Sequence, residues 1–322
     1  MTQQRPIDST RPDKICVKDK LILALVRFAL RLSARLPLGT VRQLGRWFGR
    51  RYFAIDGRRR RITARNIALA YPKLSAEAQH TMVRGCLEET GALIAEMGHL
   101  WAKPWDEVSE LVVEVEGAET LAAALATGRG VIVLGPHLGN WEMLGLHLAT
   151  QGDLVALFEP PKIAALGSLV QSARQNSGGR LVPTTARGLA ALVKSIKQGG
   201  VSGILPDQVP SQDSAGLNVP FMGIECFTAS LGCNLINRSG AIALMGAAMR
   251  VPGGFKLRYI EPAEDLYSDD LMTALTAMNK EVERLLVGWD TQYQWLYKRY
   301  RTRPKGGVEH YQNLKAPRAP TE

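Results

Sequence analysis

From residue 111 onward the sequence alternates between short, β-branched apolar runs and longer stretches with helical spacing of apolar residues. The apolar runs predict strands at residues 111–115, 131–135, 154–158, 201–205, 241–249 and 255–260. The stretches between many of them predict helices at 118–126, 141–150, 163–176, 186–197, 228–237 and 269–287. Strands that alternate with helices form mainly parallel sheets with helices on both faces. We therefore expect an α/β fold with a mainly parallel sheet flanked by helices.

Four regions are expected along the chain of 322 residues. Residues 1–17 are polar and predict a disordered leader, and residues 18–110 predict a helical, membrane-associating region. The α/β domain should occupy 111–305, followed by a flexible polar tail at 306–322. An apolar fraction of 46% supports a sizeable core and excludes global disorder.

Residues 18–38 predict an amphipathic helix. Arg27, Arg31 and Arg35 recur every four residues and share one helical face. Each arginine would cost roughly 2.5–3.5 kcal/mol at the centre of a bilayer, so the helix should lie in the membrane interface instead of spanning it. The alternative is a surface helix whose apolar face packs on the protein's own core.

The amino-terminal quarter is strongly basic. Residues 1–73 hold 18 of the 40 Lys and Arg residues but four of the 30 Asp and Glu residues. This asymmetry favours an anionic partner, such as acidic phospholipid, phosphorylated lipid or an acidic carrier protein. The run Arg58–Arg61 also permits nucleic acid, but its neighbours at 39–56, a second basic helix with several aromatic residues, favour lipid phosphate. A long helix is expected at 75–101, beginning at Ser75.

Several function classes lack their motifs. The four cysteines are scattered, with no zinc-ligand spacing, so we expect reduced thiols and no metal. No phosphate-binding or dinucleotide-binding glycine motif follows a strand, and no G-x-S-x-G element is present. The sequence therefore predicts no cofactor.

One short stretch combines a strand, a turn and a candidate base. The expected strand 131–135 ends at Gly135-Pro136, His137 follows, and a helix should begin at Trp141 after the N-cap Asn140. Ligands usually bind at the carboxyl ends of strands in such sheets. An imidazole needs a fixed tautomer to act as a base, and Glu142 can supply a carboxylate across the turn. Alternatively, Glu142 only favours the helix N-terminus.

The stretch Gly135–Glu142 resembles the H-x₄-D/E motif of glycerolipid acyltransferases, and more narrowly the late acyltransferases of lipid A biosynthesis. Three further blocks match this family in order, over roughly residues 20 to 305. They are R-N-I-A-L-A-Y-P from Arg65, L-P-D-Q from Leu205 with V-P-F-M-G from Val219, and Q-W-L-Y-K-R-Y from Gln294.

The resemblance implies a membrane-associated O-acyltransferase at the cytoplasmic face of the bacterial inner membrane. It implies acyl carrier protein as donor, a lipid A precursor as acceptor and no nucleic acid partner. His137 would deprotonate the acceptor hydroxyl, with Glu142 orienting the imidazole. Backbone N–H groups near Gly139 and Asn140, or a nearby arginine, would stabilise the oxyanion.

The L-P-D-Q block adds two further candidates. The resemblance makes Asp207 and Gln208 neighbours of the active site, where a carboxylate and an amide can orient a hydroxyl or brace the loop. The alternative is ordinary turn chemistry at a strand end. The block from Val219 would form an apolar bend lining an acyl groove, or pack in the core, and Thr228 fits an N-cap.

The chain departs from the family where an arginine usually follows the third strand, because Glu159 stands there. Four residues are candidates for the missing cation, namely Lys162, Arg174, Arg180 and Arg187. Arg187 matches the family pattern best and is the favoured phosphate or carrier contact. The departure leaves open another lipid acceptor, such as a lysophospholipid or aminolipid. A non-enzymatic protein that binds membrane or nucleic acid through its basic region is the remaining alternative.

Overall fold

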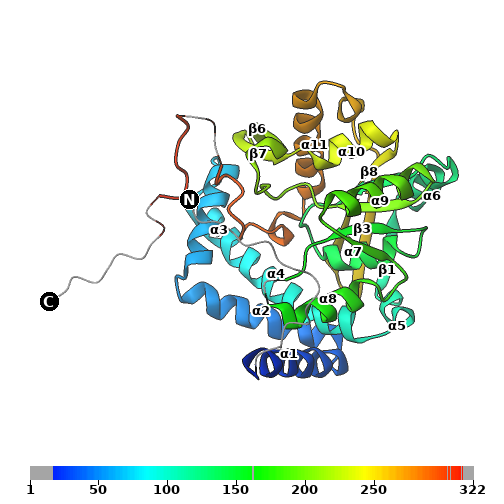
Figure 1. Ribbon diagram of the computed structural model, residues 1–322. Coiled ribbons are helices and arrows are strands. Elements are labelled where there is room, and N and C mark those ends of the chain that lie inside the picture. Colours follow the sequence, from blue (N-terminus) through cyan, green and yellow to red (C-terminus); the bar gives the residue numbers. More distant parts are fainter. Residues whose placement is uncertain (1–16, 162, 303, 305, 313, 315–322) are drawn as a thin grey trace.

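The structure is a computed structural model that describes residues 17–161, 163–302, 304, 306–312 and 314 (Figure 1). The leader expected at 1–17 lies almost wholly outside this part of the chain. The expected α/β fold with a mainly parallel sheet is confirmed. Figure 1 shows the sheet and its helices on one side of the molecule and the amino-terminal helices α1 to α4 on the other.

The central sheet has five strands in the order β1-β9-β8-β2-β5. These are β1 (Val112–Glu116), β9 (Gly254–Ile260), β8 (Ile242–Val251), β2 (Val131–Leu134) and β5 (Val201–Ile204). All neighbouring pairs are parallel except the hairpin β8–β9. Each of these strands lies within a residue or two of its expected position. The carboxyl ends of β2 and β5 therefore meet at one edge of the sheet.

Two small sheets accompany the central one. β3 (Val155–Phe158) pairs in parallel with β4 (Arg180–Pro183), and β4 was not predicted. β6 (Gly216–Phe221) and β7 (Ile224–Ala229) form an antiparallel hairpin. The bend expected from Val219 is therefore a strand and a tight turn, in which Met222 and Gly223 adopt positive φ. Thr228 lies in β7 and is not an N-cap, because α10 begins only at Leu231.

Helices cover both faces of the central sheet. Along β2, Val131 and Val133 pack on one side with α6 (Ala118–Ala126) and α7 (Trp141–Leu148), while Ile132 and Leu134 pack on the other. That second side holds α9 (Ala186–Lys197), α10 (Leu231–Ser239) and α11 (Leu271–Leu286). Shorter elements are α5 (Trp105–Ser109), α8 (Gly167–Arg174), η1 (Ala164–Leu166), η2 (Asp213–Ala215), η3 (Glu264–Tyr267) and η4 (Asp290–Gln292).

Four amino-terminal helices precede the sheet. They are α1 (Val17–Arg35), α2 (Leu38–Ala54), α3 (Arg58–Ala70) and α4 (Ala76–Ala102). Three were predicted, including the start of α4, where Ser75 accepts a hydrogen bond from the Ala78 amide. Helices α2 and α4 cross at glycines: a Cβ added to Gly91 would lie 2.0 Å from the Gly45 carbonyl oxygen.

One side of α1 packs on α4, where the Ser33 hydroxyl donates to the Ala95 carbonyl, while another apolar side is turned to solvent. On the solvent side, Leu25 is 60% exposed and Phe28 is 67% exposed. The exposed apolar surface continues onto α2 at Leu44, Trp47 and Phe48. Among the described helices, none is both long and apolar enough to cross a membrane.

Near the carboxyl terminus, within the expected tail, Tyr311 is buried. Its hydroxyl contacts the Asn66 side chain and accepts a hydrogen bond from the Tyr300 amide. Residues 315–322 lie outside the described part of the chain.

Candidate active site

The site forms where β2 and β5 end side by side. Leu134 and Ile204 are the last paired residues of these strands, and the Gly135 amide still donates to the Ile204 carbonyl. His137 and Asp207 each lie three residues beyond this last pair. Because the two strands run parallel, the segments that follow them leave the sheet at the same edge. This brings the side chains of His137 and Asp207 together.

His137 and Asp207 are joined by two hydrogen bonds. The His137 ring Nδ1 lies 2.7 Å from Asp207 Oδ1, and the His137 backbone amide donates to Oδ2 over 2.9 Å. Both residues are buried. Burial alone would raise the pKa of the Asp207 carboxyl, but the His137 charge and hydrogen bonds, with the nearby Arg299, hold that pKa below its usual value. Asp207 is therefore a carboxylate that fixes the imidazole.

The other ring nitrogen faces an amide. Gln208 Nε2 lies 3.1 Å from His137 Nε2 and also donates to Gln294 Oε1 over 3.1 Å. An amide nitrogen can only donate, so His137 Nε2 accepts, which places the ring proton on Nδ1 toward Asp207. The Trp141 ring packs edge-on against the imidazole, with 4.7 Å between the two ring centres. The lone pair of a base thus points at a polar group that an incoming hydroxyl can replace.

Glu142 does not take the role expected for it. Its carboxylate accepts hydrogen bonds from Arg174, at 2.9 Å from Nε and 2.6 Å from Nη2. Asp207 and Gln208 occupy the two ring nitrogens of His137 instead. The prediction that Glu142 orients His137 is thus corrected: Asp207, predicted only as a neighbour, holds the imidazole, and Glu142 holds Arg174.

The backbone N–H groups expected to stabilise an oxyanion, those of Gly139 and Asn140, already donate hydrogen bonds within the protein. The Gly139 amide donates to the Gln292 carbonyl, and the Asn140 amide donates to the Ala248 carbonyl over 2.7 Å. Gly139 has a φ of +63°, and a Cβ there would lie 2.0 Å from the Ala248 oxygen, so the position requires glycine. These two residues shape the loop but do not present free N–H groups to a substrate.

A buried ion network supports this loop from behind. Glu96 is fully buried and accepts from Arg42, Arg250 and the Asn140 side chain, at 2.6 to 2.9 Å. Arg250 also donates to the Gly139 carbonyl over 2.9 Å. Sequence reasoning assigned no role to Arg42 or Arg250, because both look like ordinary members of a basic chain. The only sequence signal is that Arg250 interrupts the end of an apolar strand.

Of the four candidates for the missing family cation, Arg174 is the one that contacts Glu142 and lines the apolar cavity beside this loop. Among the other candidates, Arg180 and Arg187 are exposed, and Lys162 lies outside the described residues. Glu159 is also exposed. Arg174 lies over the Phe158 ring, 5.8 Å from its centre, so it reaches the region after β3 from helix α8. Burial would lower its pKa, but the hydrogen bond and charge of Glu142 raise it.

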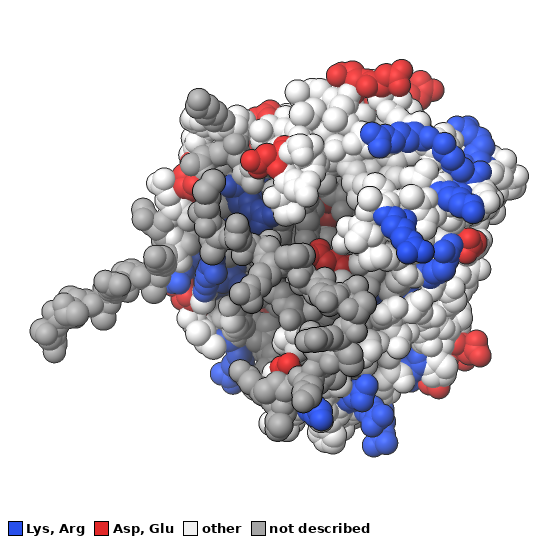
Figure 2. All heavy atoms as spheres, viewed as in Figure 1, with Lys and Arg blue, Asp and Glu red and all other residues white. Residues whose placement is uncertain are grey.

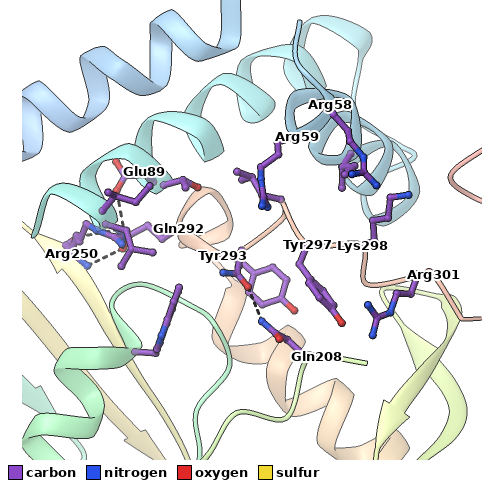
Figure 3. Close-up of a pocket in the computed structure, with 17 residues that line it drawn as sticks. Arg58, Arg59, Glu89, Gln208, Arg250, Gln292, Tyr293, Tyr297, Lys298 and Arg301 are labelled. Carbon is purple, nitrogen blue, oxygen red and sulfur yellow. Dashed lines mark hydrogen bonds and ion pairs between the residues drawn. The ribbon is translucent and has the colours of Figure 1, made fainter. Parts of the chain in front are cut away.

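Two cavities border the catalytic loop, and Trp141 lines both. The polar cavity, of about 580 Å³, is lined by Gln208 and Gln294 and by several cations, and Figure 3 shows these side chains. The apolar cavity lies over α7 and the strand ends. Most of the side chains that line it are aliphatic, and the charged residues Glu142 and Arg174 line it as well. His137 lines neither cavity itself but contacts Gln208, which lines the polar one, and Trp141, which lines both.

Two further kinds of site, a metal centre and a nucleophilic cysteine, have little support among the described residues. They contain no group of three or more His, Cys, Asp or Glu side chains that could hold a metal ion. Cys86, Cys226 and Cys233 are buried. Burial raises the pKa of all three thiols, that of Cys233 to about 12, so they are poor nucleophiles.

Comparison with known proteins shows the family of the chain. The profile of the family described as bacterial lipid A biosynthesis acyltransferase matches residues 14–302. The chain is 27% identical over 283 residues to a lipid A biosynthesis lauroyltransferase of Escherichia coli K12, covering 87% of this chain and 91% of the relative. A palmitoleoyltransferase of the same organism matches equally well. A phosphatidylinositol mannoside acyltransferase of Mycolicibacterium smegmatis is 28% identical over 138 residues, 42% of this chain and 45% of the relative. The chain is therefore an acyltransferase that belongs to the bacterial lipid A biosynthesis acyltransferase family.

Proposed function

We propose that this acyltransferase moves a fatty acyl group from an acyl carrier protein thioester to a hydroxyl of a lipid A precursor. One observation carries the proposal. The His137 imidazole is fixed by Asp207 at Nδ1 and offers Nε2 toward the polar cavity through Gln208. The names of the relatives, which span nearly the whole chain, supply the acceptor class.

The acceptor hydroxyl replaces the Gln208 amide at His137 Nε2 and gives its proton to that nitrogen. Asp207 stabilises the imidazolium that forms, because its carboxylate stays ionised beside the ring. The hydroxyl oxygen attacks the thioester carbonyl and forms a C–O bond. General base catalysis of this kind contributes roughly 10²–10⁴-fold to a rate.

The tetrahedral intermediate then collapses. The C–S bond breaks, and the proton held on His137 passes to the departing thiolate. Arg174, which Glu142 positions beside the apolar cavity, is the cation proposed for the developing oxyanion. No covalent acyl-enzyme is needed, since the acceptor oxygen itself attacks and the described cysteines are buried thiols.

The apolar cavity is the proposed place for the acyl chain. Leu144 and Leu148 of α7 and Leu157 of β3 line it, together with other aliphatic side chains. Transfer of each methylene from water to such a site is worth about 0.8 kcal/mol, which favours a long chain there. Arg187, exposed on the first turn of α9, remains the proposed contact for the acidic carrier protein.

The proposed location is the cytoplasmic face of the inner membrane. The exposed apolar side chains of α1 and α2 support it, because an apolar surface of this extent beside arginines is typical of interfacial helices. The arginines would face lipid phosphates while the leucines and aromatic rings enter the acyl region.

The test measures the transfer of a labelled acyl group from acyl carrier protein to lipid acceptors extracted from membranes. His137→Ala should lower the rate by roughly 10²–10⁴-fold. The matched control is His80→Ala, because the His80 ring lies against Phe53 and lines neither cavity. Product analysis by mass spectrometry identifies the acceptor. Transfer to lysophospholipid or aminolipid alone contradicts the lipid A assignment, and unchanged transfer by His137→Ala contradicts the mechanism.

A further inference from the structure

Besides Arg250, which is bound to Glu96, four cations from distant parts of the chain line the polar cavity. Arg58 and Arg59 come from the start of α3, while Lys298 and Arg301 come from the segment after η4. Figure 3 shows the four side chains around the same space, with Gln208 below them. Figure 2 shows Lys and Arg side chains beside a hollow in the middle of this face, over the region where α3 lies in Figure 1. We call these four residues the cationic collar.

Among the described residues, no acidic side chain forms an ion pair with the two collar arginines at the start of α3. In the described part of the chain, the side chains of Arg58 and Arg59 form no hydrogen bond or ion pair, whereas those of their neighbours Arg60 and Arg61 contact Phe53, Asp56 and the Leu314 carbonyl. Lys298 lies over the Tyr311 ring, and Arg301 donates to the Val209 carbonyl. The carboxylate that lines the cavity, Glu89, already accepts from Arg46.

The position of the arginines adds to this excess charge. A helix N-terminus carries partial positive charge and normally attracts acidic residues. α3 has no acidic residue in its first turn and no side-chain cap, but begins with four arginines. Like charges at the positive end of a helix are unfavourable, and a bound anion relieves that repulsion.

We propose that the cationic collar binds a phosphate ester of a substrate and thereby places its reacting group at His137. Guanidinium groups match the oxygens of a phosphate in a bidentate geometry, and several cations suit its double charge. The inference rests on the proposed function, because the collar lies on the same cavity as Gln208, which contacts His137. The phosphate belongs either to the lipid acceptor or to the pantetheine arm of the donor.

The test compares Arg58→Gln/Arg59→Gln and Lys298→Gln with the wild type, one variant from each segment of the collar. The matched control is Arg65→Gln/Lys73→Gln, which removes the same charge near the same helix from exposed positions that do not line the cavity. Acyl transfer is measured against acceptor concentration, with phosphorylated acceptor and with the same acceptor after phosphatase treatment. It is also measured against donor concentration, using acyl-pantetheine thioesters with and without the phosphate.

An acceptor phosphate predicts that KM for the phosphorylated acceptor rises roughly tenfold or more in both collar variants, while kcat and the KM of the dephosphorylated acceptor stay unchanged. A donor phosphate predicts the same rise for the phosphorylated thioester alone. Either result supports the collar. Equal KM values for all four substrates in the collar variants and the control overturn it.

A binding measurement separates this inference from the proposed function. Calorimetry with inorganic pyrophosphate on the full chain carrying His137→Ala needs no turnover. Binding that is roughly tenfold weaker when Arg58→Gln/Arg59→Gln is added supports the collar even if no lipid accepts an acyl group. Equal pyrophosphate affinity with and without the collar arginines overturns it, whatever the transfer assay shows.

Discussion

Glu142 and Arg174 form a bidentate ion pair in which the carboxylate accepts from both Nε and Nη2 of the guanidinium. The Glu142 side chain is 6% exposed and that of Arg174 is 35% exposed, so the pair lies at the edge of the apolar cavity instead of free in water. Glu142 thus acts on the site through Arg174, while a second carboxylate acts through His137.

Removal of one partner should therefore cost more than removal of both. Glu142→Ala leaves a partly buried guanidinium without its anion, and we expect a loss of about 1–3 kcal/mol in the free energy of unfolding after allowance for solvent screening. The double variant Glu142→Ala/Arg174→Ala should regain part of this stability but not activity, because the oxyanion cation is absent. Chemical denaturation and acyl transfer measure the two effects. Additive stability losses, or an active double variant, would contradict the pairing.

Asp207→Asn tests which carboxylate holds the imidazole. The amide keeps the size of the side chain but removes the charge that stabilises imidazolium, and it can reverse the ring tautomer. We expect kcat to fall roughly 10³–10⁴-fold with little change in the acceptor KM. Asp153→Asn is the control, since the Asp153 carboxylate accepts only from the Ser195 hydroxyl and lies at the amino-terminal end of β5, where the Val201 amide donates to the Asp153 carbonyl. If Asp207→Asn retains most of its kcat, Asp207 does not assist His137.

Much of the fold was readable because its signals are local. The β-branched runs predicted the strands of the central sheet, and Ser75 marked the start of α4. The hairpin β6–β7 was missed, since Pro220 interrupts its first strand and Met222 adopts a positive φ that sequence rarely reveals. Tertiary pairing along the whole hairpin outweighs both local signals.

The site was harder to read, because its central contact is not local. Glu142 is five positions from His137 and was the obvious partner, whereas Asp207 is 70 positions away. The order of the strands in the sheet was not known from the sequence. β2 pairs with β5 so that Leu134 lies opposite Ile204. His137 and Asp207 each come three residues after this pair, and they are therefore neighbours. A single sequence does not state which strands are neighbours. The sequence likewise did not predict that Arg42 and Arg250 are buried. Both bind Glu96, which lies far from them in the sequence.

The exposed apolar surface on α1 and α2 should govern membrane association. Leu25→Glu/Phe28→Glu removes two exposed apolar side chains and adds two negative charges, and burial of such side chains is worth roughly 1.5–3 kcal/mol each. We expect at least about tenfold weaker binding to vesicles that contain anionic phospholipid. Val113→Glu/Val287→Glu makes the same change at exposed positions outside these helices and should bind as the wild type does. Equal sedimentation of both variants with vesicles would exclude this surface.

Gly145 offers a direct test of the acyl-chain site. It lies in α7, lines the apolar cavity, and a Cβ built on it meets no atom within 4 Å. Leucine fits the helical backbone there without strain, so Gly145→Leu should fold normally while its side chain projects into the cavity. The space for the end of a long acyl chain then shrinks. We expect the ratio of kcat/KM for long over short acyl donors to fall roughly tenfold or more.

The control for this change is Gly39→Leu, which adds the same side chain to α2 at another position with no atom within 4 Å of a Cβ, but outside the cavity. Its donor preference should match that of the wild type. Competition between acyl carrier proteins loaded with chains of different length, with products weighed by mass spectrometry, gives the ratio directly. Because Gly145 lies away from the hydrogen bonds of His137, a general loss of activity with unchanged chain preference would place the acyl chain elsewhere.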